Sequence, residues 1–158
     1  MEELPDLDLA SMLTLLGDAV SGEVLRALDD TGLRHGHGYL VQRLVLGPAT
    51  ATEVAEELGV SQQAVSKAVK ELVALGHVEV VTDPTDGRRR PVRLTGRGQQ
   101  AVATARAARR EIDGRIRAIL GDEAFASTCA ALQSALDAWD RGDRVRRRAA
   151  RPPGSVLR

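Results

Sequence analysis

One stretch in the middle of the sequence constrains the fold most strongly, because residues that cap and end helices follow one another there at short intervals. Thr50 or Thr52 can cap a short helix, and Gly59 is placed to end it. Ser61 then caps a second helix, Gln62–Leu75. Two helices joined by a glycine-containing turn of about three residues predict a helix-turn-helix.

A β-hairpin pattern follows the second helix directly. Val78–Thr82 and Val92–Leu94 are rich in β-branched residues and predict two short strands. The turn between them, Asp83–Arg90, contains Pro84 and Gly87. Its tip carries three consecutive arginines: Arg88, Arg89 and Arg90. A hairpin placed immediately after a helix-turn-helix predicts a winged helix-turn-helix fold, mainly α with a small two- to three-stranded β wing.

Apolar residues at helical spacing predict four further helices around this unit. The expected ranges are Leu7–Leu28, Gly38–Leu46, a long helix capped by Thr95 that runs to about Leu120, and Glu123–Trp139. The apolar fraction of 43% is enough for a core. Because the chain has one Phe, one Trp and one Tyr, that core must be mostly aliphatic.

The balanced net charge hides two oppositely charged ends. The sequence has 22 basic Lys and Arg residues and 22 acidic residues. Acids dominate residues 1–30, whereas arginines dominate residues 141–158 and predict a basic disordered tail. The overall charge is therefore a poor guide to nucleic-acid binding, and the local charge must be considered instead.

Composition also argues against several classes of protein. No apolar run is long enough to span a membrane, and the acidic N-terminus does not resemble a signal peptide. A single cysteine cannot form an internal disulfide, so we expect a cytoplasmic protein. No phosphate-binding glycine loop, metal-ligand cluster or nucleophile–base pair is evident. We therefore do not expect an enzyme, a cofactor or a metal site.

The helix predicted at Gln62–Leu75 has two chemically distinct faces. The residues expected to pack inward are Val65, Val69, Leu72 and Val73. The candidate DNA-binding residues occupy the leading and opposite positions: Ser61, Gln62, Gln63, Ser66, Lys67 and Lys70. Glutamine can bond adenine through two atoms, serine can serve several bases, and lysine reaches phosphate or guanine. This helix is therefore the predicted recognition helix.

The arginines of the predicted wing suit a DNA contact of a different kind. A guanidinium at the tip of the hairpin can enter a minor groove, where narrow A·T-rich DNA concentrates negative potential. We therefore expect Arg88, Arg89 and Arg90 to contact DNA. Asp86 is well placed to pair with one of these arginines and to order the wing beforehand.

From Thr52 to Thr95 the sequence TEVAEELGVSQQAVSKAVKELVALGHVEVVTDPTDGRRRPVRLT resembles the MarR family of winged-helix transcription regulators. Asp86-Gly87-Arg88 matches the Asp-x-Arg pattern of that family's wing. Leu94-Thr95-Gly96-Arg97-Gly98 matches the Leu-Thr-x-x-Gly signature that opens the following long helix. The specific part of the resemblance covers about 50 residues, and the order of helices on both sides agrees with it.

The resemblance implies a homodimer that binds a pseudo-palindromic operator in double-stranded DNA. It also implies repression relieved by a small-molecule effector, often aromatic, bound between the dimer helices and the winged lobe. The expected domains are an N-terminal dimerisation helix (1–34), a DNA-binding lobe (35–98), a long helix with a C-terminal dimerisation helix (99–142) and the basic tail (143–158).

One alternative is a ligand- or metal-sensing dimer whose winged lobe contacts protein and not DNA. His35 and His37 raise the question of metal sensing, but no paired acid–histidine cluster accompanies them, and they are interpreted as structural. His77, just after a helix end, is interpreted in the same way. Cys129 is expected to be a small buried apolar residue in its helix. The arginine-rich tail could add phosphate contacts, fold back on the acidic N-terminus or simply be solvated.

Overall fold

The computed structural model describes residues 6–139, so the tail predicted at 143–158 lies outside the described residues. In chain order the elements are α1 (Leu9–Arg26), η1 (Asp29–Thr31), η2 (His35–His37), α2 (Gly38–Leu44), α3 (Ala51–Leu58), α4 (Gln62–Ala74), β1 (Val78–Val80), β2 (Val92–Leu94), α5 (Gly96–Leu120) and α6 (Asp122–Ala138). The predicted fold class, mainly α with a small β wing, is confirmed.

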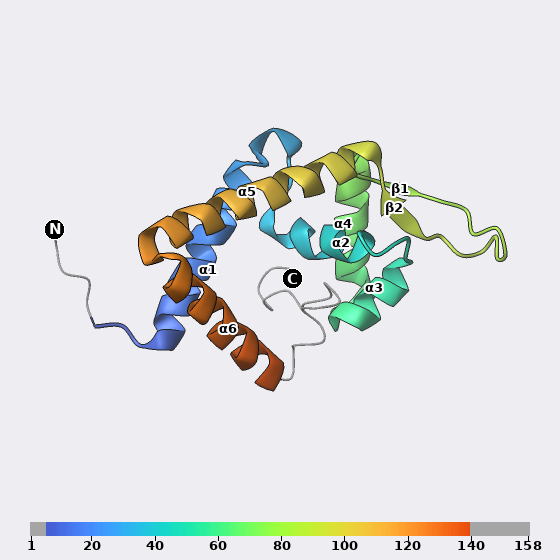
Figure 1. Cartoon of the computed structure of the whole chain (residues 1–158). Coiled ribbons are helices and arrows are strands. Elements are labelled where there is room, and N and C mark those ends of the chain that lie inside the picture. The colour runs from blue at the N-terminus through green and yellow to red at the C-terminus, as the bar shows by residue number, and fades with distance from the viewer. Residues whose placement is uncertain (1–5, 140–158) are drawn as a thin grey trace.

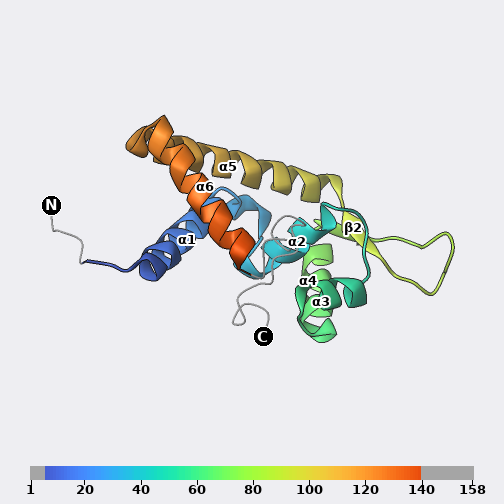
Figure 2. The same cartoon turned by 60° about the horizontal axis from the view of Figure 1, so that its bottom comes forward.

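The elements form a lobe joined to a helical arm. Helix α5 runs from the wing to the opposite end of the molecule, where α6 turns back from it and α1 packs beside it (Figure 1). Helices α2, α3 and α4 lie together at the other end of α5, and the hairpin loop projects outward from them (Figure 2). The arrangement separates the winged lobe from the helices α1 and α6.

Local capping defines the helix-turn-helix as predicted. The Thr50 hydroxyl accepts a hydrogen bond from the Glu53 N–H at 3.2 Å, which identifies Thr50, and not Thr52, as the cap of α3. Gly59 ends α3 in the left-handed conformation with φ 66°, a backbone state that costs glycine no Cβ clash. Ser61 caps α4 by accepting the Ala64 N–H at 3.2 Å.

Fewer residues pair between the two strands of the wing than the sequence predicted. Strands β1 and β2 are antiparallel, with Val78 opposite Leu94 and Val80 opposite Val92. The predicted first strand, Val78–Thr82, stops at Val80, because the next contact is a single bond from the Val81 N–H to the carbonyl of Pro91, which has no N–H to return. Ala49 forms an isolated bridge with Val92 and adds a third short segment.

Two separate groups of buried aliphatic side chains stabilise the protein. The first fills the winged lobe and centres on Val54, Leu58, Val65, Leu72 and Val78. The second joins α1 to α5 through Val24, Leu28, Ala101, Ala105 and Ile112. Helix α6 contributes no buried side chain to either group. The fold of one chain therefore leaves α6 attached along one side only.

Two expectations about buried faces were wrong. Val73 of α4 was expected to pack inward, but it is 42% exposed. Ala68 is buried on the inward side of α4 together with Val65 and Leu72. The reason is that Val73 lies one residue beyond Leu72, and successive helix positions point about 100° apart. Cys129 is exposed on α6, because α6 has no neighbour that covers its outer surface within this chain.

The outer helices expose an unusual amount of apolar surface. Large apolar side chains that are at least 38% exposed on α1, at the end of α5 and on or next to α6 are Leu9, Met12, Leu13, Leu15, Leu16, Ile119, Leu120, Leu132, Leu136 and Trp139. Such patches on a folded chain commonly mark a protein–protein interface. Within residues 6–139, no helix is both long enough and apolar enough to cross a membrane.

Candidate nucleic-acid interface

Helix α4 presents the predicted recognition residues on its outer side. Val65, Ala68 and Leu72 bury the opposite side in the lobe core. Ser61, Gln62, Gln63, Lys67 and Lys70 are exposed, and Ser66 is half-buried. The structure therefore brings all six predicted residues onto one accessible side of α4. That surface offers hydrogen-bond donors and acceptors and two cations.

An open cleft of about 810 Å³ runs beside this surface. One wall is α4, with Ser61, Gln63, Ser66, Lys67 and Lys70. The other wall is the segment that leads into α2, Arg34–His37. Gln62 is exposed as well, but it lies outside the cleft. The cleft is open, and its walls carry the basic side chains of Arg34, Lys67 and Lys70, which suit an approaching phosphate backbone.

The one carboxylate in the wall of the cleft, Glu71, is already paired. One of its oxygens, Oε2, accepts hydrogen bonds from Arg34 Nη2 at 2.5 Å and from His37 Nε2 at 2.9 Å. The hydrogen bond from His37, followed by that from Arg34, lowers the pKa of the Glu71 carboxyl below its ordinary value of 4.5. The negative charge of Glu71 is thus offset within the protein. The net charge of the cleft is therefore positive and comes from Lys67 and Lys70.

His37 acquires its orientation from the same turn. The Arg34 N–H donates to His37 Nδ1 at 3.2 Å, so Nδ1 is the acceptor and Nε2 carries the hydrogen donated to Glu71. The His37 side chain is 4% exposed. Sequence reasoning missed Arg34 and Glu71, because 37 residues separate them and no local pattern links them.

The other two histidines also have structural surroundings. His35 packs edge-on against Tyr39, with ring centroids 6.2 Å apart. His77 is completely buried, and its Nε2 donates to the Thr31 carbonyl at 2.9 Å, so it braces the turn after α1 and does not sit at the surface of a helix end. Among residues 6–139, no group of three His, Cys, Asp or Glu side chains is arranged to hold a metal ion.

Asp83 organises the turn of the wing. Its Oδ1 accepts the Thr85 N–H at 2.9 Å, the Thr85 hydroxyl at 2.6 Å and the Asp86 N–H at 3.3 Å. The hydroxyl bond from Thr85 is the main reason why the pKa of Asp83 is lowered from 3.8. This is the local hydrogen bonding by which aspartate stabilises tight turns.

Asp86 was expected to pair with one of the wing arginines, and its actual role is different. Its carboxylate accepts the backbone N–H of Arg88 at 3.0 Å, and its carbonyl accepts the N–H of Arg89 at 3.0 Å. A carboxylate two residues before a backbone N–H reaches it more readily than it reaches a long guanidinium side chain. Asp86 therefore orders the wing through the main chain.

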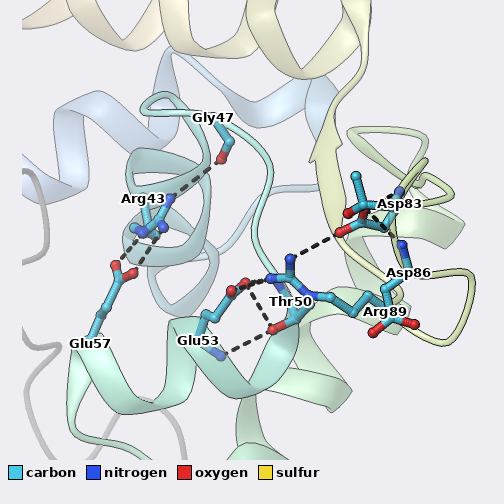
Figure 3. Close-up of polar contacts among 9 residues, drawn as sticks. Arg43, Gly47, Thr50, Glu53, Glu57, Asp83, Asp86 and Arg89 are labelled. Atoms are coloured by element: carbon cyan, nitrogen blue, oxygen red, sulfur yellow. Dashed lines mark hydrogen bonds and ion pairs between the residues drawn. The ribbon is translucent and has the colours of Figure 1, made fainter.

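The three arginines of the tip are not equivalent. Arg89 forms an ion pair with Asp83, Nη1 to Oδ2 at 2.9 Å, and a second ion pair through Nη2 with Glu53 of α3 (Figure 3). Arg88 and Arg90 are exposed, and neither has an ion-pair partner within residues 6–139. The tip thus offers two uncommitted cations and one that is held against the helix-turn-helix.

Comparison with known proteins agrees with this geometry. The MarR family model matches residues 37–89, which include α3, α4 and most of the wing. No match exists among curated proteins. Similar solved structures cover 82–84% of this chain, so the similarity of fold extends beyond the residues that the family model matches.

Three solved structures illustrate the range of similar proteins. Transcriptional regulator Tm0710 from Thermotoga maritima is 24% identical, with a TM-score of 0.65 over 84% of this chain and 94% of that one. MepR of S. aureus, solved as a complex with DNA, is 17% identical, with a TM-score of 0.67 over 82% and 98%. The Mycobacterium tuberculosis MarR family protein Rv2887, solved with salicylic acid, is 26% identical, with a TM-score of 0.61 over 83% and 98%.

Proposed function

The chain carries the winged helix-turn-helix of the MarR family of transcription regulators, and from it we propose that the protein is a dimeric, sequence-specific DNA-binding repressor. The observation that carries the proposal is the exposed polar side of α4, which bears Lys67 and Lys70 beside an open basic cleft. An α-helix of this kind fits the width of the major groove. The MepR–DNA complex supports the same use of a similar fold.

In this proposal the two parts of the interface have separate tasks. Gln62, Gln63 and Ser66 of α4 contact base edges, while Lys67 and Lys70 neutralise phosphates. Ser61 presents the N-terminus of α4, whose free N–H groups favour a phosphate oxygen. The wing supplies arginine to an adjacent minor groove, with Asp86 keeping the tip ordered.

A second copy of the chain is the proposed cover for the exposed apolar side chains of α1 and α6. Leu16 is 59% exposed and Trp139 is 71% exposed, although both belong to amphipathic stretches that would normally be half-buried. A two-fold symmetric pairing of these helices would bury both sets at once. It would also present two α4 helices to a pseudo-palindromic operator.

The regulatory part of the proposal is a small aromatic effector that weakens operator binding. It is supported by the Rv2887 structure, which contains salicylic acid, and it assigns no effector-binding residue in this chain. An effector weakens operator binding if it binds one dimer conformation more tightly than the DNA-bound one. In that conformation the two winged lobes do not match the spacing of the operator half-sites.

Selection of bound fragments from a random DNA pool tests the proposed function. Wild-type protein should recover an inverted repeat, and Gln63→Ala should relax the preference at the same position of both half-sites, at a cost of about 1–3 kcal/mol per lost base contact. Binding without any enriched sequence, and lost at about 0.2 M salt, would refute the proposal. The alternative, a sensing dimer whose lobe contacts protein, would then be favoured.

A further inference from the structure

Arg89 differs from its two neighbours because it bridges two elements that are distant in the sequence. Its guanidinium reaches Asp83 within the wing and Glu53 in the first turn of α3, 36 residues away (Figure 3). The Arg89 side chain is 44% exposed, so it lies along the surface of the lobe and does not extend freely into solvent.

Both carboxylates that hold Arg89 are themselves fixed. Glu53 uses Oε2 to accept the Thr50 N–H at 2.7 Å and the Thr50 hydroxyl at 3.0 Å, and it uses Oε1 for Arg89. Asp83 divides its oxygens in the same way, with Oδ1 in the turn of the wing and Oδ2 on Arg89. Bonds from Thr50 and the nearby charge of Arg89 lower the pKa of Glu53.

Because each carboxylate is anchored by one oxygen and binds Arg89 with the other, the arginine connects two rigid points. One point is the capping box of α3, and the other is the turn at the base of the wing tip. A planar guanidinium with several N–H donors can hold two acceptors in a fixed relative orientation. Two carboxylates offset the charge of Arg89, so it attracts a phosphate less strongly than the unpaired Arg88 and Arg90 do.

We propose that Arg89 is a positioning residue that locks the wing against the N-terminus of α3, and that the DNA contacts of the wing tip come from Arg88 and Arg90. The inference rests on the proposed DNA-binding function. It revises the expectation that all three arginines contact DNA. The lock would keep the hairpin at the orientation that places Arg88 and Arg90 in the groove when α4 is docked, which reduces the ordering cost of binding.

Glu53→Gln tests the proposal through the direction in which the affinity for the operator changes. Glutamine keeps an oxygen for the capping box but loses the charge that holds Arg89. Loss of the lock should weaken binding to the selected operator by about two- to tenfold. If Arg89 is instead a phosphate contact, removing a nearby acid and freeing the arginine should strengthen binding. Equal or tighter binding by Glu53→Gln therefore overturns the proposal.

A matched control and a double variant separate the lock from general charge effects. Glu56→Gln removes the same charge from an exposed position of α3 that does not contact Arg89, and should leave binding unchanged or slightly tighter. Arg89→Gln should weaken binding, and adding Glu53→Gln should cause little further loss, because both changes open the same lock. Additive or opposing effects would contradict the lock. Arg88→Gln removes one DNA-contacting cation from each subunit of the dimer, so it should reduce the slope of log affinity against log salt by about 1.8, or about 0.9 per subunit.

A measurement without DNA distinguishes failure of the lock from failure of the proposed function. Backbone ¹⁵N order parameters of residues 85–90 should fall in both Arg89→Gln and Glu53→Gln, but not in Glu56→Gln. Unchanged order in the first two variants would overturn the lock even if the protein binds its operator. If the wild type selects no operator, the proposed function fails, while the order parameters still report on the lock.

Discussion

Gly98 allows the junction between the winged lobe and α5 to be tested quantitatively. A Cβ atom at this position would lie 2.1 Å from the carbonyl oxygen of His77, whereas such contacts are essentially never closer than 3.0 Å. The carbonyl cannot simply turn away, because it accepts the Thr95 N–H at 3.0 Å. The Thr95 hydroxyl also donates to the Gly76 carbonyl at 2.6 Å, so α5 begins tightly against the turn before β1.

Gly98→Ala should therefore destabilise the protein even though alanine favours helices. The usual gain from replacing a glycine inside a helix is about 1 kcal/mol. Against it stand an overpacking cost of about 1–3 kcal/mol and about 1 kcal/mol for a weakened hydrogen bond at the junction. We expect a net loss of about 2 kcal/mol. Gly114→Ala in the same helix meets nothing within 4 Å and should stabilise by up to about 1 kcal/mol.

Urea unfolding followed by circular dichroism measures both variants. Protein concentrations must be matched, since dimerisation would make apparent stability concentration-dependent. The midpoint should fall for Gly98→Ala and rise for Gly114→Ala, with the denaturant slope unchanged. A Gly98→Ala protein at least as stable as the wild type would refute the reasoning, because it would mean that the His77 carbonyl moves at little cost.

Three other perturbations have definite expected outcomes. Leu16→Glu places a charge on the exposed face of α1 and should convert the proposed dimer to a folded monomer in analytical ultracentrifugation; an unchanged mass would argue against that interface. Leu72→Ala, at a fully buried position, should cost about 2–5 kcal/mol in urea unfolding, and a loss below 1 kcal/mol would contradict the core assignment. The lowered pKa of Glu71 stabilises the fold above pH 4.5, and this contribution is lost as pH falls through the folded pKa. Glu71→Gln should therefore be destabilising at pH 7, with a difference from wild type that shrinks below pH 4.5; a constant difference would rule out the ionised Glu71 pairing.

Features that depend on neighbouring residues were predictable from the sequence. Ser61 and Gly59 define helix ends through hydrogen bonds and backbone angles that involve only a few residues on either side. The hairpin likewise depends on two adjacent β-branched runs and the turn between them. For these reasons the order of elements and the polar side of α4 followed from the sequence with small errors at the ends of elements.

Features that depend on distant partners were not predictable. The sequence placed three equivalent arginines in the wing, but only the packing of the wing beside α3 brings Glu53 within reach of Arg89. The pairing of Arg34 and His37 with Glu71 depends in the same way on how the segment before α2 lies against α4. Burial of Cys129 was predicted from its residue type, and the surroundings of α6 decided otherwise.

The most direct test of the central claim is the affinity for the selected operator before and after about five base pairs are inserted between its half-sites. Two α4 helices fixed in one dimer require half-sites on the same side of the duplex, about one helical turn apart. The insertion turns one half-site to the opposite side, so affinity should fall to that for unrelated DNA at the same salt concentration. Undiminished affinity would show that the lobes bind independently, and it would contradict the proposed dimeric reading of an inverted repeat.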